Sequence, residues 1–335
     1  MITEQKVKEW SERIFMEKTF ELFFISGLPK SGTSWCSNFL NSLQGIKVLG
    51  EGRFFAGKLK NLQTLYEQLE KAVDGWVEFV GRRKGNWLLN DQYIVTINKT
   101  NYIPSDILEK EKKEISCLLI KHLIYNLASR ASEFYGVHKV GDKTPIFSPS
   151  EIKNWISCFN KERFIILTRD FIDWVVSLSL HFYHSNLTNR PDRHNIWLSD
   201  EDLIFIHKFK EGKEKSILKK ERVWILAEFY KEMVETFEFL FNANKDRILL
   251  IKYEDLFNYP EEHFRAVCDF LGIDVSEAEL NKAIDEVSIQ KVKKSDGYMN
   301  EHIRVAYPGK GYEFFSYEVN EILEWIKTGS GLKKE

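Results

Sequence analysis

The stretch FELFFISGLPKSGTSW, residues 20–35, decides the fold of this 335-residue chain. Its apolar run FELFFI, residues 20–25, stops at a Ser-Gly pair and predicts a fully buried strand. After a tight loop, apolar residues recur at helical spacing: Cys36, Phe39, Leu40 and Leu43. This spacing predicts a helix that starts near Gly32 or Thr33. A strand, a glycine-containing loop and a helix in this order indicate a phosphate-binding loop.

Further apolar runs predict the rest of the sheet. RFIILT, residues 163–168, and RILLIKY, residues 247–253, each read as a buried strand followed by a polar turn and a helical pattern. VHKVGDKTP, residues 137–145, predicts a shorter strand that ends near Gly141. Strands that alternate with helices predict an α/β fold with a central, mainly parallel sheet flanked by helices. Ligands of such folds bind at the carboxyl ends of the strands, so the polar residues there are the first candidates.

The chain shows no internal repeat and no Pro/Ser/Gly-rich linker, which predicts one domain over residues 1–335. Residues 1–18 are predicted to form a short amphipathic helix. The net charge of −2 lacks the basic excess that nucleic-acid-binding proteins usually show, so we expect no nucleic-acid partner. No run reaches the roughly 18–20 apolar residues that a membrane span needs, and no signal peptide is evident. We therefore expect a cytoplasmic protein without a membrane span.

The cysteines show no metal-binding or disulfide pattern. They are scattered, without a CxxC pair or neighbouring histidines: Cys36, Cys117, Cys158 and Cys268. The scatter predicts small core residues in a reduced protein, with neither a disulfide framework nor a zinc site.

The predicted phosphate loop carries its lysine in an unusual place. Measured against GxxxxGK[ST], residues 27–34 keep both glycines, Gly27 and Gly32, but Thr33 replaces the lysine and Lys30 lies three residues earlier. In a nucleoside triphosphatase the lysine would reach over the β and γ phosphates and act together with Mg²⁺. Backbone N–H groups at a loop-to-helix junction can still bind an anion. The displaced lysine predicts a 5′ phosphate with a different terminal group, and the alternative is a turn without a ligand.

A second phosphate site is predicted at the end of another strand. Arg169 ends the buried run 163–168, and Ser177 lies eight residues further on, in the first turns of the next helix. An arginine can bind a phosphate through two hydrogen bonds, and a serine hydroxyl can donate a third. The alternative is that Arg169 only pairs with Asp170 or Asp173.

These two motifs, in this order, resemble those of sulfotransferases that use 3′-phosphoadenosine 5′-phosphosulfate (PAPS). PKSGTSW resembles the family's 5′-phosphosulfate loop, which implies a P-loop-like sulfotransferase fold and assigns this loop to PAPS binding: Pro29, Lys30, Ser31, Gly32, Thr33, Ser34 and Trp35. Residues 164–182 resemble the 3′-phosphate motif, matched by Arg169, Asp173, Val176 and Ser177. Phe171 stands where the family often has proline.

Three weaker matches extend the resemblance over roughly residues 20–315. IKYEDL resembles the segment whose tyrosine, here Tyr253, neighbours the adenine. EVSIQKVKKS resembles the stretch along the purine, with Ser288 as a hydrogen-bond donor and Ile289 in place of the usual aromatic residue. IRVAYPGKGYEFF resembles the loop that closes on the 3′ phosphate, with these matches: Arg304, Gly309, Lys310 and Gly311.

The resemblance also implies catalytic roles. We assign Lys30 to the bridging oxygen of the leaving group, and Lys143 to the sulfonate. Glu51 matches the base of glycosaminoglycan-type sulfotransferases, and Asp142 is the second choice. Pro145 stands where cytosolic sulfotransferases carry their catalytic histidine, so that mechanism does not apply. If residues 181–197 form a lid, two histidines there are further candidates: His181 and His184.

The sequence thus predicts transfer of a sulfuryl group from PAPS to a hydroxyl, or as a second choice an amine, of a small-molecule or carbohydrate acceptor. We expect no metal ion, because the chain shows no cluster of metal ligands. A P-loop kinase or nucleoside triphosphatase and an inactive nucleotide-binding module are the alternatives. A lid-like insertion is predicted at about 181–222, within which the charged run 208–222 is read as solvated surface rather than as a substrate site.

Overall fold

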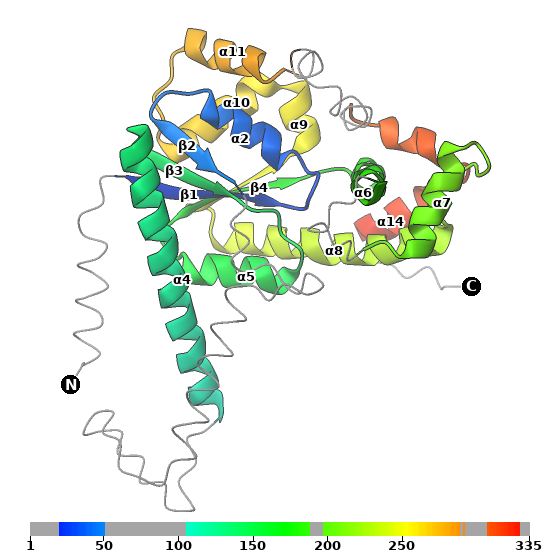
Figure 1. The fold of residues 1–335 in the computed structure, drawn as a ribbon, viewed down its shortest axis with the longest axis horizontal. Helices are drawn as coiled ribbons and strands as arrows, with labels where there is room; N and C mark the ends of the chain where they lie inside the picture. Colours follow the sequence, from blue (N-terminus) through cyan, green and yellow to red (C-terminus); the bar gives the residue numbers. More distant parts are fainter. Residues whose placement is uncertain (1–19, 51–104, 188–196, 289–290, 292–306, 329–335) are drawn as a thin grey trace, which may run out of the picture.

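The computed structural model of the chain describes residues 20–50, 105–187, 197–288, 291 and 307–328 (Figure 1). Its centre is a sheet of five parallel strands in the order β2-β3-β1-β4-β5. The strands are β1 (Glu21–Gly27), β2 (Ile46–Leu49), β3 (Lys139–Lys143), β4 (Arg163–Thr168) and β5 (Ile248–Lys252). The predicted parallel α/β fold is confirmed, and β3 runs two residues past the predicted end at Gly141.

Alternate residues of the central strands point to two separate cores. In β1, Leu22 and Phe24 pack on one face, whereas Phe23 and Ile25 pack on the other. The same alternation holds in β4 and follows from the period of two in a strand. Both faces are apolar because both are covered, as is usual for parallel sheets.

Helices cover both faces of the sheet (Figure 1). One face packs against α2 (Thr33–Asn41), α9 (Tyr253–Asn258), α10 (Pro260–Leu271) and α11 (Glu277–Glu286). The other face packs against α4 (Ser105–Tyr135), α5 (Pro149–Cys158), α6 (Phe171–Leu187) and α8 (Lys220–Ala243). Three further elements complete the described chain: α7 (Asp200–Lys210), the 3₁₀ helix η1 (Lys310–Phe314) and α14 (Asn320–Thr328).

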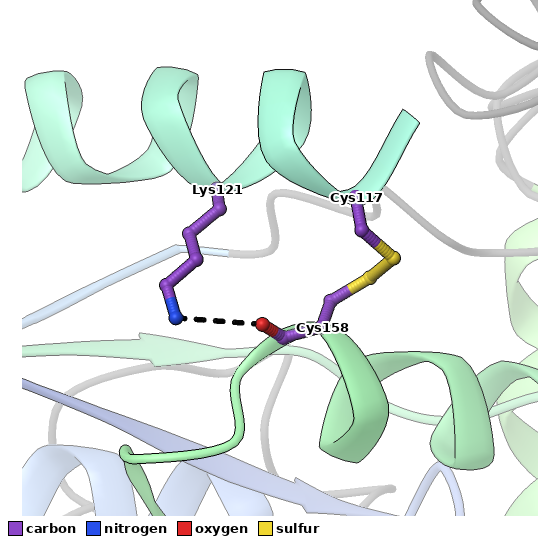
Figure 2. Close-up of a disulfide and its surroundings, with 3 residues drawn as sticks. All are labelled: Cys117, Lys121 and Cys158. Carbon is purple, nitrogen blue, oxygen red and sulfur yellow. Dashed lines mark hydrogen bonds between the residues drawn. A yellow bond between two sulfur atoms is a disulfide. The ribbon is translucent and has the colours of Figure 1, made fainter. Parts of the chain in front are cut away.

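The cysteine prediction is wrong for one pair. Cys117 of α4 and Cys158, the last residue of α5, form a disulfide with a Cα–Cα distance of 5.2 Å (Figure 2). The residues are 41 positions apart, and only the packing of α4 beside α5 brings them together. Cys36 and Cys268 are free and buried, as predicted, and burial raises the pKa of each thiol to about 12.

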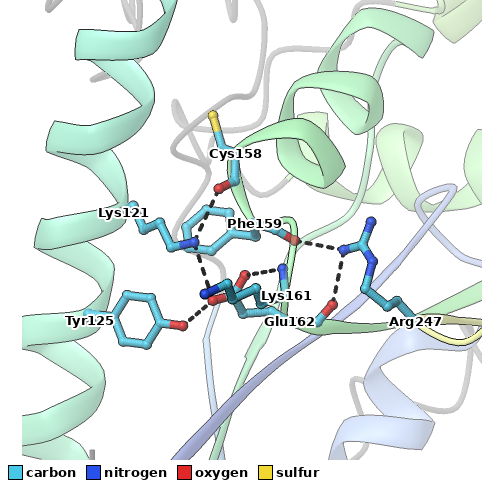
Figure 3. A network of polar contacts seen from close by, with 7 residues as sticks. All are labelled: Lys121, Tyr125, Cys158, Phe159, Lys161, Glu162 and Arg247. Atoms are coloured by element: carbon cyan, nitrogen blue, oxygen red, sulfur yellow. Dashed lines mark hydrogen bonds and ion pairs between the residues drawn. The ribbon is translucent and has the colours of Figure 1, made fainter. Parts of the chain in front are cut away.

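A buried carboxylate lies next to this disulfide (Figure 3). Glu162 is 5% exposed, accepts a hydrogen bond from the hydroxyl of Tyr125, and forms an ion pair of 3.5 Å with Lys121. The Lys121 ammonium also donates to the carbonyl of Cys158 at 3.5 Å. Burial and the Glu162 charge raise the pKa of Tyr125. The long helix α4 is therefore attached to the end of α5 by a covalent bond and to the turn before β4 by a charged network.

The region of the predicted insertion contains regular structure. Residues 181–187 continue α6, α7 follows after residues outside the described ranges, and α8 begins at Lys220. Within the charged run 208–222, Ile217 and Leu218 are fully buried. The reading of the whole run as solvated surface therefore needs correction, because its apolar residues belong to the core. The predicted helix at 1–18 lies outside the described residues, and the single-domain organisation stays a prediction.

Candidate active site

The loop between β1 and α2 has a backbone that its sequence makes possible. Gly27 and Gly32 have φ values of 144° and 94°. A Cβ on Gly27 would lie 2.2 Å from the carbonyl oxygen of Leu167, and one on Gly32 would lie 2.5 Å from the ring of Tyr253. Lys30, with φ 70°, is the only non-glycine residue with positive φ in the part of the chain that the structure describes. The lysine therefore occupies a sparsely populated conformation at the centre of the loop.

Side chains from α6 and from the end of β4 bind the backbone of this loop. The indole N–H of Trp174 donates to the carbonyl of Pro29 at 2.8 Å, and the Arg169 guanidinium donates to the carbonyl of Lys30 at 3.0 Å. Within the loop, the Ser31 hydroxyl donates to the carbonyl of Leu28 at 2.6 Å. These bonds satisfy the loop carbonyls, whereas an anion needs N–H groups.

The start of α2 presents such N–H groups. The first N–H groups of a helix have no partner within the helix, and the positive end of its dipole favours an anion. Gly32 occupies the N-cap position and, lacking a side chain, provides no capping hydrogen bond. Thr33 is buried and Ser34 is exposed at the first two positions of α2. The residues present therefore fit a phosphate at this point.

Arg169 lies at the carboxyl end of β4, directly beside the loop. The residue is 5% exposed, and its guanidinium lies 4.6 Å from the centre of the Tyr253 ring. Burial raises the pKa of Tyr253 to about 12, although the Arg169 charge acts in the opposite direction. The hydroxyl of Tyr230 donates to the Arg169 carbonyl at 2.6 Å, and Glu254 accepts from the N–H of Asp170 at 2.9 Å. The turn that carries the arginine is thus fixed on both sides.

The acidic residues after Arg169 bind backbone N–H groups. Asp170 accepts from the N–H groups of Ile172 and Asp173 at 3.0 and 3.2 Å, which caps the first turn of α6. Asp173, fully buried, accepts from the N–H groups of Gly309 and Gly311 at 2.6 Å each. Burial raises the pKa of Asp173, and these two bonds and the Arg169 charge partly offset the shift.

The other members of the predicted 3′-phosphate site lie at the same end of α6. Ser177 is buried, one helical turn after Asp173. Gly309 has φ 81°, and Lys310 is exposed at the first position of η1, where it forms an ion pair with Glu313. The structure thus brings the predicted arginine, serine and 309–311 turn to one end of α6, whereas Arg304 lies outside the described residues.

Two of the candidate acceptor-side residues, Asp142 and Lys143, are the last residues of β3, the neighbour of β1. The Lys143 ammonium lies 3.5 Å from the hydroxyl of Ser34 at the start of α2. Asp142 is buried and accepts from the Thr144 hydroxyl at 2.6 Å. Glu51, the first choice for the base, lies outside the described residues. His181 and His184 lie on α6 and are partly buried.

Aromatic residues form a wall beside the loop. Trp35 contacts the rings of Tyr253, Phe257 and Phe264 at centroid distances of 5.9, 6.2 and 5.5 Å. The indole N–H of Trp35 is buried and has no hydrogen-bond partner within the described ranges. Ser288, predicted to lie along the purine, follows α11, and its N–H donates to the carbonyl of Asp285 at 3.2 Å.

Three residues around the site were missed by the sequence analysis: Trp174, Tyr230 and Glu254. Each has a polar atom bonded to the backbone of the loop or of the Arg169 turn. Trp174 fits the apolar pattern of a buried helix, so periodicity alone treats it as a core residue. Glu254 could have been found from the sequence, because this acidic residue directly follows the candidate Tyr253, just after the end of a predicted strand.

Two further features of the described residues concern metal-ligand groups and helices that could cross a membrane. They include no group of three or more His, Cys, Asp or Glu side chains arranged to hold a metal ion. Among the helices that the structure describes, none combines the length and the apolar composition that a membrane crossing requires.

The fold is shared with one solved structure, and two others are similar to the chain at lower scores. Mouse sulfotransferase SULT7A1 complexed with PAP matches with 14% identity over 95% of this chain and 88% of that chain, at a TM-score of 0.50. The sulfotransferase domain of the Synechococcus PCC 7002 olefin synthase matches with 14% identity over 95% and 98%, at 0.45. Retinol dehydratase in complex with androsterone and inactive cofactor PAP matches with 15% identity over 96% and 88%, at 0.42. A search of curated proteins found no significant match.

The family assignment rests on the sequence itself. The family model described as the sulfotransferase domain matches residues 21–307, which include both predicted phosphate motifs and the whole five-stranded sheet. The chain therefore belongs to the sulfotransferase family.

Proposed function

We propose that this sulfotransferase uses PAPS as its donor and transfers the sulfuryl group to a hydroxyl of a small-molecule or carbohydrate acceptor. The observation that carries the proposal is the 3.0 Å hydrogen bond from the Arg169 guanidinium to the carbonyl of Lys30. This bond joins the candidate 3′-phosphate site to the candidate 5′-phosphate loop. A nucleotide that bears phosphates on both its 3′ and 5′ positions matches two adjacent anion sites. Mouse SULT7A1, whose structure contains PAP, supports the same choice of nucleotide through its fold.

In this proposal the phosphate loop binds the 5′ end of the donor. The N–H groups at the start of α2 and the hydroxyls of Thr33 and Ser34 bind the phosphate. As the acceptor oxygen bonds to sulfur, the bond from sulfur to the bridging oxygen breaks, and adenosine 3′,5′-bisphosphate (PAP) leaves with the electron pair. Negative charge develops on that bridging oxygen, and the Lys30 ammonium stabilises it. Lys30 has a positive φ, a backbone conformation that non-glycine residues rarely adopt, and this conformation sets the direction in which its side chain leaves the loop.

The 3′ phosphate is assigned to Arg169, Ser177 and the turn at 309–311. The guanidinium supplies the positive charge, and the buried serine hydroxyl one turn beyond Asp173 supplies a further donor. Trp35 and Tyr253 form an aromatic wall against which an adenine ring can pack.

The acceptor is deprotonated by a base as it attacks. Glu51 is our first choice and Asp142 the second, with His181 and His184 as further candidates. Asp142 lies near the carboxyl end of β3, the neighbour of β1, and so at the edge of the sheet where the phosphate loop begins. Lys143 is proposed to bind the sulfonate oxygens, since its charge lies next to the start of α2.

Two other aspects of the proposal concern the setting of the reaction. The Cys117–Cys158 disulfide disagrees with the prediction of a cytoplasmic protein, because disulfides usually form in oxidising compartments.

We also propose that residues 181–222 cover the acceptor side of the site. This region joins α6, which carries Ser177, to α7 and α8.

The family match gives no support to the kinase alternative, and a binding comparison tests it directly. PAP should raise the melting temperature of the protein more than ATP with Mg²⁺ at equal concentration, because the tighter ligand stabilises the native state more. Adenosine 5′-monophosphate (AMP), which lacks the 3′ phosphate, serves as the matched control. Equal or greater stabilisation by ATP with Mg²⁺ would refute the proposal.

Replacing Lys30 separates an enzyme from a binding module. Lys30→Ala should lower the rate of sulfuryl transfer by about 10²–10³-fold, because a positive group at the developing charge is lost. Binding of PAP, measured by calorimetry, should weaken far less. Lys153→Ala, an exposed lysine on α5, is the control and should leave both quantities unchanged. A wild-type protein that binds PAP but transfers no sulfuryl group to any of a broad panel of acceptors, followed by mass spectrometry, would favour the binding module.

A further inference from the structure

A side chain of α6, that of Asp173, binds the backbone of the C-terminal turn at 309–311. Asp173 is fully buried, and each of its two carboxylate oxygens accepts one backbone N–H, from Gly309 and from Gly311, at 2.6 Å. These residues are separated by 136 and 138 positions in the chain. A buried carboxylate is costly unless it is fully hydrogen-bonded, so both bonds are needed to keep it there.

The spacing along the chain places this attachment within the candidate 3′-phosphate site. Asp173 lies four residues after Arg169 and four residues before Ser177. On a helix, residues four apart lie on one face, so Asp173 and Ser177 share a face of α6. The positive charge of Arg169 also acts on Asp173, since it opposes the rise in the pKa of that carboxyl group that burial causes. The turn is therefore attached next to the two groups assigned to the phosphate.

The contact is so close that it specifies glycine at position 311. A Cβ on Gly311 would lie 2.8 Å from an Asp173 carboxylate oxygen, 2.8 Å from the backbone carbon of Ile172 and 2.9 Å from the N–H nitrogen of Asp173. The neighbours are mainly backbone atoms at the start of α6, which cannot move aside at low cost. Asp173 on α6 therefore requires a residue without a side chain at position 311, and the sequence GKG at 309–311 provides one.

The other end of the same segment is also fixed. The N–H of Ile217 donates to the carbonyl of Phe314 at 2.9 Å, and the hydroxyls of Ser216 and Ser316 lie 2.7 Å apart. The N–H of Ser316 also donates to the Ser216 hydroxyl at 3.0 Å. Since residues 314–316 are fixed independently by this neighbour, loss of the Asp173 bonds should release the 309–311 turn without unfolding the segment behind it.

We propose that Asp173 is a positioning residue that holds the 309–311 turn against the start of α6 and thereby increases the affinity for a nucleotide with a 3′ phosphate. It acts through backbone N–H groups of the turn and does not itself touch the ligand, because two negative groups in contact would repel. This inference rests on the proposed function, since it concerns the phosphate that Arg169 and Ser177 are assigned to bind.

The decisive measurement is a ratio of affinities in the full-length protein. Asp173→Asn keeps the size of the side chain, but its amide nitrogen then faces a backbone N–H, so one of the two bonds becomes a repulsion. Affinity for PAP, measured by calorimetry, should fall about tenfold or more, whereas affinity for AMP should change less than twofold. A purely structural role would weaken both nucleotides equally. An unchanged PAP affinity, or equal losses for both nucleotides, would overturn the inference.

A matched control is available on α7. Asp202 is also buried, and its carboxylate also accepts a backbone N–H, from Ser199 at 2.7 Å, in addition to an ion pair with Arg222. Asp202→Asn should lower the melting temperature and leave the ratio of PAP to AMP affinity unchanged. A wild-type protein that does not bind PAP would refute the proposed function itself, which is a different outcome from a variant that binds as well as wild type.

A second variant and a ligand-free readout cover the case in which Asp173→Asn does not fold. Gly311→Ala leaves Asp173 in place but inserts a methyl group into the contact, and it should lower the same affinity ratio by about tenfold. Without any nucleotide, amide hydrogen exchange of a peptide over residues 307–316 should be faster in either variant than in wild type. Unchanged exchange in this peptide together with an unchanged affinity ratio would contradict the role of the pair.

Discussion

The phosphate loop and the α4–α5 junction each join distant segments of the chain, but only the junction does so through a covalent bond and an ion pair between side chains. At the loop, side chains bind backbone atoms, as Trp174 and Arg169 bind the carbonyls of Pro29 and Lys30. At the junction, the disulfide Cys117–Cys158 and the bonds of Glu162 join side chains to one another, and Lys121 adds a bond to the Cys158 carbonyl (Figures 2 and 3).

This difference separates the positioning of a backbone from the attachment of a helix. In the proposed function, the loop keeps Lys30 at a positive φ and leaves the first N–H groups of α2 available to the donor nucleotide. Hydrogen bonds to its carbonyls achieve this without occupying those donors. At the junction, the carboxylate of Glu162 accepts from Tyr125 and pairs with Lys121, so these polar groups bind one another. We therefore expect changes at the loop to alter nucleotide binding, and changes at the junction to alter stability alone.

The largest expected effect is the loss of the disulfide. Cys117→Ser opens a covalent loop spanning 41 residues, which in the chain-entropy model lowers the free energy of unfolding by about 4 kcal/mol. The affinity for PAP should stay within twofold of wild type, because the junction is not part of the nucleotide site. Urea denaturation and calorimetry measure the two quantities.

Reduction of the wild-type protein is the control for this substitution. A reducing agent should lower stability by a similar amount, and a thiol reagent should detect two thiols in the unfolded, unreduced chain and four after reduction. Cys36 and Cys268 should not react in the folded protein, since both are buried and the pKa of each is about 12. Four reactive thiols in the unreduced, unfolded chain would show that the disulfide does not form.

The next largest effect is expected at the phosphate sites. Arg169→Lys keeps the positive charge but removes the planar pair of donors, and PAP affinity should fall about 30-fold, or about 2 kcal/mol. The affinity for AMP should fall less than threefold, because the arginine is assigned to the 3′ phosphate. An equal loss of affinity for PAP and AMP, or an unchanged affinity for PAP, would contradict the assignment of Arg169 to the 3′ phosphate and with it the contrast with the junction.

The smallest expected effect tests the support behind Arg169. Tyr230→Phe removes the 2.6 Å hydrogen bond to the Arg169 carbonyl and should lower the free energy of unfolding by about 1 kcal/mol. PAP affinity should fall by less than about fivefold, because the guanidinium keeps its own contacts with Lys30 and Tyr253. Tyr259→Phe, on an exposed tyrosine, is the control and should change neither quantity. A loss of PAP affinity as large as that of Arg169→Lys would show that Tyr230 acts on the ligand directly.

The strands and the start of α2 could be predicted because their signals are local. β4 has the predicted bounds, and α2 begins at Thr33, where the apolar spacing placed it. The order of the sheet, β2-β3-β1-β4-β5, is not local and came only from the structure. The same limit applies to Cys117 and Cys158, whose pairing depends on how α4 packs beside α5.

The sequence by itself determined the elements of the phosphate loop, the displaced Lys30, and Arg169 at the end of its strand, because glycines, charges and apolar runs act over a few residues. Only the tertiary structure decided that Arg169 binds the Lys30 carbonyl and that Asp173 binds the turn at 309–311. Those bonds join residues more than a hundred positions apart. Their partners are backbone groups, which every residue carries and no sequence pattern marks.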